Sequence, residues 1–402
     1  MKNKYVITLL SAILGIGLMF LGTKVLNRSA ATTSLKVGFI YIGDKVTAYT
    51  NNFIRSQIEL ESALGDKVQT IAKYNIPEDD EECTSAIEDL VHQGCNLIFT
   101  TSYGFMDSTK KMAKKYPQVQ FCQATGDNAN AAPVLSNYHT FMGTIYEGRY
   151  ISGIVAGLKL QELIAQGKVK RTAAKIGYIA AFPYAEVISG YTAFFLGVRS
   201  IVGEAEMSVI YTNTWSNHVI EKKTAEKLIE EGCVIISQHS DTTGPAIACE
   251  EASTKRGKTV FHVGYNQSMT DVAPTTSLVS CRINWTPYIL GASQAILKGL
   301  PIEKYLKSTL NGNDTGFGFD KNWVEIIGLN RLLAAKGTQE EIEKALRLLK
   351  SKNTSIFRGN YVGVNPFDSD DIWDLKTPFI ENQNSSAPQF HYVLNDVITV
   401  EE

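Results

Sequence analysis

The sequence has 402 residues, of which 44% are hydrophobic and 20% are charged, and its formal net charge is −2 at pH 7. Because one domain usually holds about 100–200 residues, this length predicts two packed domains with hydrophobic cores. The nearly neutral charge creates no field that would collect nucleic acid or acidic lipid, so we expect no nucleic-acid partner and a small molecule as the ligand.

The first segment of the chain has the pattern of an export signal. Met1 to Lys4 are basic, and Tyr5 to Gly22 then carry no charge. An apolar run of about 18 residues fits an uncleaved membrane anchor as well as a cleaved signal peptide, and a buried core helix fits the basic start less well. Ser29-Ala30-Ala31 resembles a cleavage site. We predict that residues 1–34 are a signal peptide or membrane anchor with a linker, which makes the protein extracytoplasmic and either membrane-associated or secreted.

Four pairs of matching residues recur along the chain at nearly constant spacing. They are Lys36 and Lys175 (175 − 36 = 139), Asn75 and Asn213 (213 − 75 = 138), Gly94 and Gly232 (232 − 94 = 138), and Phe121 and Phe261 (261 − 121 = 140). Four pairs in the same order indicate an internal duplication. Within each copy, strand and helix patterns alternate, which predicts a parallel sheet with right-handed crossovers and helices on both faces.

The duplication predicts an α/β fold of two Rossmann-like lobes joined by hinge crossovers. The small-residue-rich helix pattern from Glu147 to Leu158 is expected to pack closely against a neighbour as the chain crosses between lobes. A second crossing is expected after Trp285, where Thr286 to Lys298 predicts a helix that returns to the first lobe. We predict lobe one at 35–145 plus about 287–325, lobe two at 146–286, and a C-terminal extension at 326–402 that packs on the lobes.

Helix ends and the C-terminal extension give further expectations. Asp79 to Glu82 crowd the start of a helix, where negative charge is favoured, and Ser216 or Asn217 is expected to cap the matching helix of the second copy. In the extension, Glu340 to Lys350 predicts a helix and Phe390 to Val400 a final strand.

The residue types that bind metals are scattered. The six cysteines form no C-x-x-C pair, which favours buried free thiols and leaves a disulfide open. Asp368, Asp370 and Asp371 lack the glycine and distal glutamate of an EF-hand loop, so we expect a solvated turn there. We therefore predict no metal site.

Ligands of open parallel sheets bind outside the carboxyl ends of the strands, so the loops that follow each strand are the candidate site. These loops carry aromatic faces that stack on flat rings and polar groups that fix orientation, which suits a planar, polar-edged ligand. The candidate ligand-binding residues are Asp44, Tyr49, Tyr103, Phe105, Asp127, Phe182, Tyr184, Trp215, His239, Asp241, Tyr265, Asn266, Asn284 and Trp285.

Sequence signatures of catalysis are missing. The chain has no G-x-G-x-x-G after its first strand in either copy, no G-x-x-x-x-G-K-[ST] loop and no H-E-x-x-H motif. We therefore predict no catalytic residues, no cofactor and no enzymatic activity. An enzyme is kept as a weaker alternative, because Rossmann-like lobes host many reactions.

Several motifs in order resemble the basic membrane protein family of ABC-transporter substrate-binding proteins. They are Gly43-Asp44-Lys45, EGRYISGIVAG from Glu147, AAFPYAEVISGY from Ala180, TNTW from Thr212 and QHSDT from Gln238, within a resemblance that covers about residues 35 to 330. The resemblance implies a type I periplasmic-binding-protein fold, a purine nucleoside or purine base as ligand, and an ABC transporter permease as partner. The alternatives are a ligand-sensing receptor for a membrane signalling partner and, less favoured, a nucleoside-processing enzyme.

The chain departs from the family pattern at two places. Relatives are commonly lipoproteins, but no cysteine precedes Cys83, so a signal anchor or secretion is expected in place of lipid attachment. Relatives also tend to carry an aspartate where this chain has Asn266. If that carboxylate holds a ribose hydroxyl, the amide leaves a free purine base or a different sugar contact open.

Overall fold

The computed structural model describes residues 34–352 and 355–401. The predicted signal or anchor lies outside the described residues, apart from Ser34. Within the described ranges, no helix has the length and apolar character of a membrane span.

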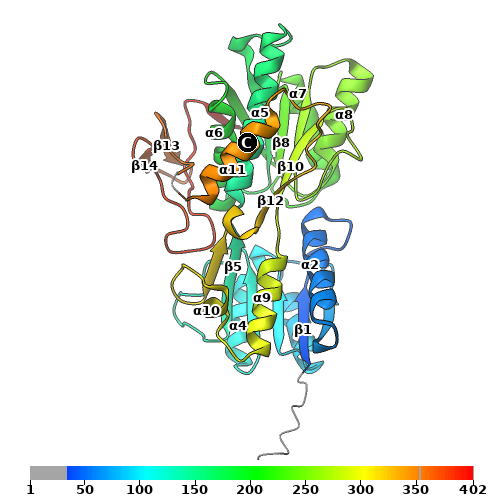
Figure 1. The fold of residues 1–402 in the computed structure, drawn as a ribbon, viewed down its shortest axis with the longest axis vertical. Coiled ribbons are helices and arrows are strands. Elements are labelled where there is room, and N and C mark those ends of the chain that lie inside the picture. Colours follow the sequence, from blue (N-terminus) through cyan, green and yellow to red (C-terminus); the bar gives the residue numbers. More distant parts are fainter. Residues whose placement is uncertain (1–33, 353–354, 402) are drawn as a thin grey trace, which may run out of the picture.

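The first lobe is built on a six-stranded parallel sheet with the order β11-β5-β4-β3-β1-β2 (Figure 1). Its strands are short runs of largely buried residues, as expected for a sheet covered on both faces. Their bounds are β1 (Leu35–Ile40), β2 (Val68–Lys73), β3 (Leu97–Thr100), β4 (Gln120–Ala124), β5 (Tyr138–Gly143) and β11 (Asp314–Phe317).

The second lobe is built on a seven-stranded sheet with the order β12-β10-β9-β8-β6-β7-β15. Only β12 runs antiparallel to its neighbour. The bounds are β6 (Lys175–Ala180), β7 (Glu206–Tyr211), β8 (Ile235–His239), β9 (Phe261–Tyr265), β10 (Ser277–Ile283), β12 (Val324–Ile327) and β15 (Ile398–Glu401).

The predicted duplication is confirmed by the strand order. Without the added edge strands, β2-β1-β3-β4-β5 in one sheet corresponds to β7-β6-β8-β9-β10 in the other. Matched residues also share their backbone conformation: φ is 56° at Asn75 and 53° at Asn213, and 87° at Gly94 and 91° at Gly232. The α/β fold of two Rossmann-like lobes is therefore correct, while the residue ranges predicted for the lobes stay a prediction.

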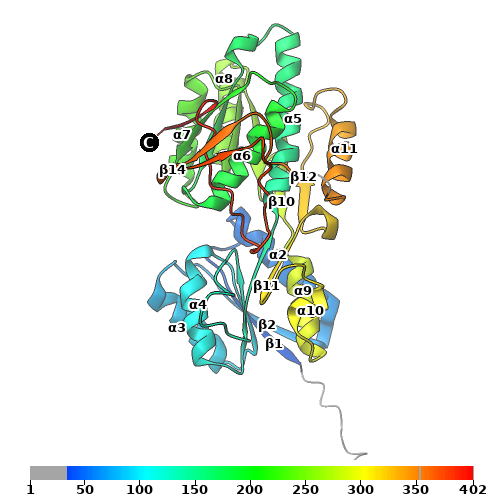
Figure 2. The same cartoon turned by 90° about the vertical axis from the view of Figure 1, so that its left-hand side faces the viewer.

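Helices cover both faces of each sheet (Figures 1 and 2). In the first lobe α2 packs on α9 and α3 packs on α4, and in the second lobe α5 packs on α6 and α7 on α8. Their bounds are α2 (Ala48–Leu64), α3 (Asp80–His92), α4 (Met106–Lys115), α5 (Ile145–Ala165), α6 (Ala185–Arg199), α7 (His218–Glu230), α8 (Gly244–Arg256), α9 (Thr286–Leu297) and α10 (Ile302–Leu306).

Helix α5 approaches α6 as closely as its small residues allow. A Cβ built on Gly153 would lie 1.9 Å from the carbonyl oxygen of Phe194, and one on Gly197 would lie 2.2 Å from that of Tyr150. Both clashes involve backbone atoms, which cannot move aside as a flexible side chain can. The close packing expected for the segment from Glu147 to Leu158 is confirmed.

The predicted helix caps are also confirmed. Asp79 accepts hydrogen bonds from the backbone N–H groups of Glu81 and Glu82, and Asn217 accepts one from that of Ile220. All six cysteines are free and buried.

Within residues 34–352 and 355–401, the chain crosses between the lobes three times. The first crossing joins β5 to α5, the second joins β10 to α9, and the third, which the sequence did not reveal, joins β11 to β12. The crossings contact one another: the N–H of Thr144 donates to Phe317 O (3.0 Å), and that of Asn284 donates to Trp323 O (2.8 Å). Three adjacent crossings form a hinge rather than a flexible tether.

The C-terminal extension packs mainly on the second lobe. It contains α11 (Thr338–Lys350), a hairpin of β13 (Val362–Asn365) and β14 (Asp368–Asp374), and β15. Its loop also reaches down towards the first lobe (Figure 2). There the N–H of Ser386 donates to Asp314 on β11 (2.7 Å).

Two expectations for the extension are wrong. The segment from Phe390 to Val400 is not one strand: it makes an isolated bridge at Val393 and becomes a strand only at β15, because the chain first leaves the hairpin and then joins the edge of the second sheet. Asp368, Asp370 and Asp371 lie in β14 rather than in a turn. Within the described residues, no cluster of three or more histidine, cysteine, aspartate or glutamate side chains could hold a metal ion.

Candidate ligand-binding cleft

A cavity lies between the lobes, where loops from the carboxyl ends of strands in both sheets meet. The first lobe contributes Ile42, Tyr49, Ser102, Tyr103 and Thr125, and the second contributes Glu186, Trp215, His239, Asp241 and Tyr265. Six of the predicted residues are therefore brought together: Tyr49, Tyr103, Trp215, His239, Asp241 and Tyr265. The cavity encloses about 40 Å³, well below the roughly 300–1,000 Å³ of ligand pockets.

Aromatic rings form one side of the cleft. Phe182 stacks on Tyr184 with ring centroids 5.2 Å apart and meets Trp215 edge-on at 5.0 Å. Tyr184 also contacts Tyr103 of the other lobe, at 5.3 Å. Phe182 and Tyr184 do not line the cavity, but they support the ring of Trp215, which does.

Tyr49 contributes an aromatic face from α2 of the first lobe. Its hydroxyl donates to the carbonyl oxygen of Thr101 (2.6 Å), which fixes the ring beside the loop after β3. Its ring packs edge-on against Phe53 at 5.3 Å.

A chain of polar side chains crosses the cleft. Asn266 donates to Asp241 Oδ1 (2.8 Å) and accepts from Asn52 on α2 of the first lobe (3.2 Å). Burial raises the pKa of Asp241 to about 8, and the nearby Glu221 carboxylate adds to the shift. Because Asp241 is then mostly protonated at neutral pH, it can donate a hydrogen bond as well as accept one.

Glu186 and His239 form the polar end of the cavity. Glu186 Oε1 lies 3.4 Å from His239 Nε2. Burial lowers the pKa of His239 to about 4, and the positive charge of Arg149 adds to the shift, so the imidazole is neutral at neutral pH. Sequence reasoning missed Glu186, because it lies in the first turn of α6 and not in the loop before it. Its place within the AAFPYAEVISGY motif was the available signal.

Phe105 and Trp285 lie in the hydrophobic core. Phe105 is 0% exposed and Trp285 is 1% exposed. Trp285 stacks on Phe53 with ring centroids 4.4 Å apart. Both residues follow a strand, but their side chains turn inward and close the core below the cleft.

Three further predicted residues lie away from the cavity. Asp44 accepts from the N–H of Val46 (2.9 Å) within its own turn, and Asp127 is exposed. Asn284 belongs to the hinge, where it donates to Asn322 O (3.1 Å) and accepts from the N–H of Thr286 at the start of α9 (3.2 Å).

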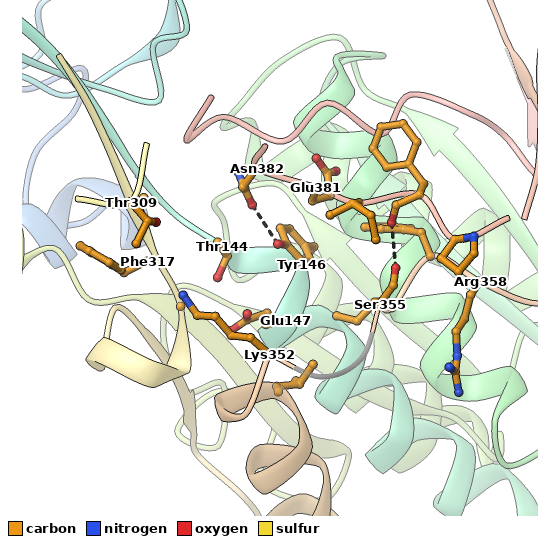
Figure 3. A pocket seen from close by; sticks show the side chains of 18 of the residues that line it. Thr144, Tyr146, Glu147, Thr309, Phe317, Lys352, Ser355, Arg358, Glu381 and Asn382 are labelled. Carbon is orange, nitrogen blue, oxygen red and sulfur yellow. Dashed lines mark hydrogen bonds between the residues drawn. The ribbon is translucent and has the colours of Figure 1, made fainter. Parts of the chain in front are cut away.

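A second cavity, of about 580 Å³, lies beside the hinge (Figure 3). Phe317 lines it from β11, while Tyr146 and Glu147 line it from the first turn of α5. Glu147 accepts from the N–H of Phe319 (2.9 Å), and burial raises its pKa to about 7. Tyr146 donates to Asn382 of the extension (2.8 Å), so this cavity joins the first and third crossings to the C-terminal loop.

Comparison with known proteins gives one family and several relatives. Residues 44–356 match the family model described as ABC transporter substrate-binding protein, PnrA-like. A purine-binding protein of Brucella abortus is 36% identical over 270 residues, which are 67% of this chain and 71% of that protein. A putative ABC transporter glucose-binding protein of Haloferax volcanii is 32% identical over 193 residues, which are 48% of this chain and 44% of that protein.

The fold recurs in solved structures. An ABC transporter solute-binding protein of Aeropyrum pernix K1 has a TM-score of 0.64 to this chain, with 84% of this chain and 95% of that chain covered. The two sequences are 14% identical, so this similarity shows the fold alone.

Proposed function

The chain belongs to the family of PnrA-like substrate-binding proteins of ABC transporters, and we propose on this premise that its cleft binds a purine base or purine nucleoside. As a member of this family the chain is an extracytoplasmic binding protein rather than an enzyme, and it presents a small molecule to a membrane permease. We further propose that residues 1–34 direct export and, if uncleaved, anchor the protein to the membrane.

The lining of the cavity is the observation that carries the purine proposal. Tyr49, Tyr103, Trp215 and Tyr265 supply flat faces from both lobes, and Asp241 supplies a hydrogen-bonding edge. Stacking between aromatic rings with a few placed polar groups is the arrangement that a planar heterocycle requires. The similarity to the Brucella purine-binding protein supports the same ligand class.

The partners of Asn266 favour contacts to the base over contacts to a sugar at this position. Its side-chain oxygen accepts from Asn52, and its side-chain nitrogen donates to Asp241. Asn266 is 2% exposed, and one N–H and one oxygen lone pair of its amide are then left for a ligand. A ribose hydroxyl would therefore have to find its main partner elsewhere in the cleft.

Ligand entry requires the lobes to separate, because a cavity of about 40 Å³ is too small for a purine. In our proposal the ligand enters an open cleft, stacks on aromatics of the second lobe, and shifts the hinge equilibrium towards a closed form that the permease recognises. Closure then brings Tyr49 and Tyr103 against the ligand.

Isothermal titration calorimetry on the purified full chain tests the ligand class. The protein is first stripped of bound molecules by denaturation and refolding and then titrated with adenine, guanine, hypoxanthine and their nucleosides, with glucose as a comparison. We expect micromolar or tighter binding of at least one purine and at least tenfold weaker binding in Trp215→Ala, since stacking is worth about 0.5–1.5 kcal/mol beyond the buried area.

The other outcomes discriminate among alternatives. Glucose binding without purine binding would reject the purine proposal and favour the ligand named for the Haloferax relative. Equal purine affinity in the wild type and in both Trp215→Ala and Asp241→Ala would place the site elsewhere. Binding of the free bases without binding of their nucleosides would assign Asn266 a role in ligand specificity.

A further inference from the structure

Arg149 on α5 carries a buried charge directly behind the cleft. The residue is 1% exposed, and its Nη1 donates to the carbonyl oxygen of Gln238 (2.7 Å). Its Nε and Nη2 have no hydrogen-bond partner within the described residues, and no carboxylate there forms an ion pair with it. The guanidinium keeps its proton at any physiological pH, so an incompletely paired positive charge lies inside the second lobe.

Such a charge is costly for the fold. A buried ion without a counter-ion destabilises a protein, and an apolar side chain of similar size often replaces a buried ion at no loss of stability. Filling space therefore does not explain an arginine at this position. Its neighbours indicate what the charge acts on.

The first neighbour is Tyr265, which lines the cavity while Arg149 does not. The guanidinium carbon lies 3.6 Å from the centroid of the Tyr265 ring, so the two planar groups are in full contact. Because one face of the ring is occupied by Arg149, a ligand can meet only its other face or its edge. The contact fixes the plane of the ring and draws its electron density away from the cleft.

The second neighbour is His239, whose ring packs edge-on against Tyr265 at 5.0 Å. A Cβ built on Gly190 would lie 2.9 Å from His239 Nδ1 and 3.8 Å from Arg149 Nε, so the two nitrogens are at most 2.9 + 3.8 = 6.7 Å apart. Among the described residues, the charged or titratable groups near His239 include Arg149 on α5, Glu186 on α6 and Tyr265 on β9, and Asp241 in the following loop lines the same cavity. Arg149 is the positive group among them and opposes protonation of the imidazole.

We propose that Arg149 is a positioning residue of the cleft, which holds Tyr265 in the plane that receives the ligand and places a positive charge beside His239. This inference rests on the proposed function. Its consequence is a selective site: Arg149 is opposite in charge to the Glu186 carboxylate without forming an ion pair with it, while His239 and Asp241 are neutral at neutral pH. The cleft then accepts an uncharged, electron-rich planar heterocycle and rejects cationic analogues.

Two readouts on the full chain separate charge from stacking. The titration of His239 is followed by NMR on protein with ¹³C-labelled histidine, with its signal assigned by its loss in His239→Gln. Adenine affinity is measured by calorimetry at pH 7.5. Arg149→Met removes both charge and planar group, whereas Arg149→Lys keeps the charge and removes the planar group.

We expect the titration midpoint of His239 to rise by about one pH unit or more in Arg149→Met and to stay near the wild-type value in Arg149→Lys. Adenine affinity should fall roughly tenfold in both variants, because neither keeps the stacked guanidinium. If Arg149 only supported the fold, the titration midpoint of His239 would not differ between the two variants.

An unmoved midpoint in a folded Arg149→Met protein would overturn the charge role, and unchanged adenine affinity in both variants would overturn the positioning of Tyr265. Near-ultraviolet circular dichroism checks the fold, and Arg149→Gln replaces Arg149→Met if the latter does not fold. Because the NMR titration needs no ligand, absence of binding of every purine base and nucleoside tested on the wild type would reject the purine proposal without affecting the test on His239.

Discussion

At the residue scale, the proposed closure of the cleft should depend on pH through Asp241. Its pKa is raised to about 8 by burial, but solvation in open lobes would return it towards the ordinary value near 4. Closure therefore takes up a proton between about pH 4 and pH 8, and it weakens as the pH rises through this window, by at most about 1.4 kcal/mol per pH unit. Energy transfer between dyes on cysteines introduced at Asp66 and Glu204 should report less closure at pH 8.5 than at pH 6.

The matched variant is Asp241→Asn, which keeps the shape and hydrogen-bonding capacity of the side chain but cannot ionise. Its closed fraction should not fall with pH as that of the wild type does. If the closed fraction of both proteins fell with pH in the same way, its pH dependence would belong to another group. Glu147 at the hinge is the next candidate, because burial raises its pKa to about 7.

At the element scale, the contact of α5 with α6 supports the second lobe beneath the cleft. Gly153→Ala should lower the free energy of unfolding by roughly 1–3 kcal/mol, because its methyl group would meet the carbonyl oxygen of Phe194 and force the helices apart. Gly203→Ala is the control, since a Cβ there meets nothing within 4 Å. Urea denaturation measures both, and equal stability of the two variants would contradict close packing as the reason for glycine at position 153.

At the scale of the whole molecule, we expect the hinge and the Asn52–Asn266 hydrogen bond to set the balance between the proposed open and closed lobes. Asn52→Ala removes this contact between the lobes, so the closed fraction in the absence of ligand should fall by a factor of about 2–10, the effect of one net hydrogen bond. The same dye pair measures it. Ser56→Ala is the control, because Ser56 bonds Thr286 within the first lobe, and a similar loss of closure in that variant would remove the special role of Asn52.

Local patterns in the sequence determined the elements and their duplication. Apolar runs, helix caps and left-handed glycines act over a few residues, so the matched positions Gly94 and Gly232 indicated two similar lobes before any contact was known. The rule that ligands bind at the carboxyl ends of parallel strands likewise selected the loops that carry Tyr49, Trp215 and Asp241.

Only the tertiary structure decided which side chains of those loops face the cleft. Phe105 and Trp285 follow strands as Trp215 does, yet the first two close the core, because the direction of a side chain depends on the elements packed around it. Glu186 and Arg149 belong to helices, and no local pattern reports that α5 and α6 bring them behind the strand ends. The sequence by itself thus determined the lobes and the position of the cleft, whereas the packing of α5, α6 and the hinge decided its charge and its polar contacts.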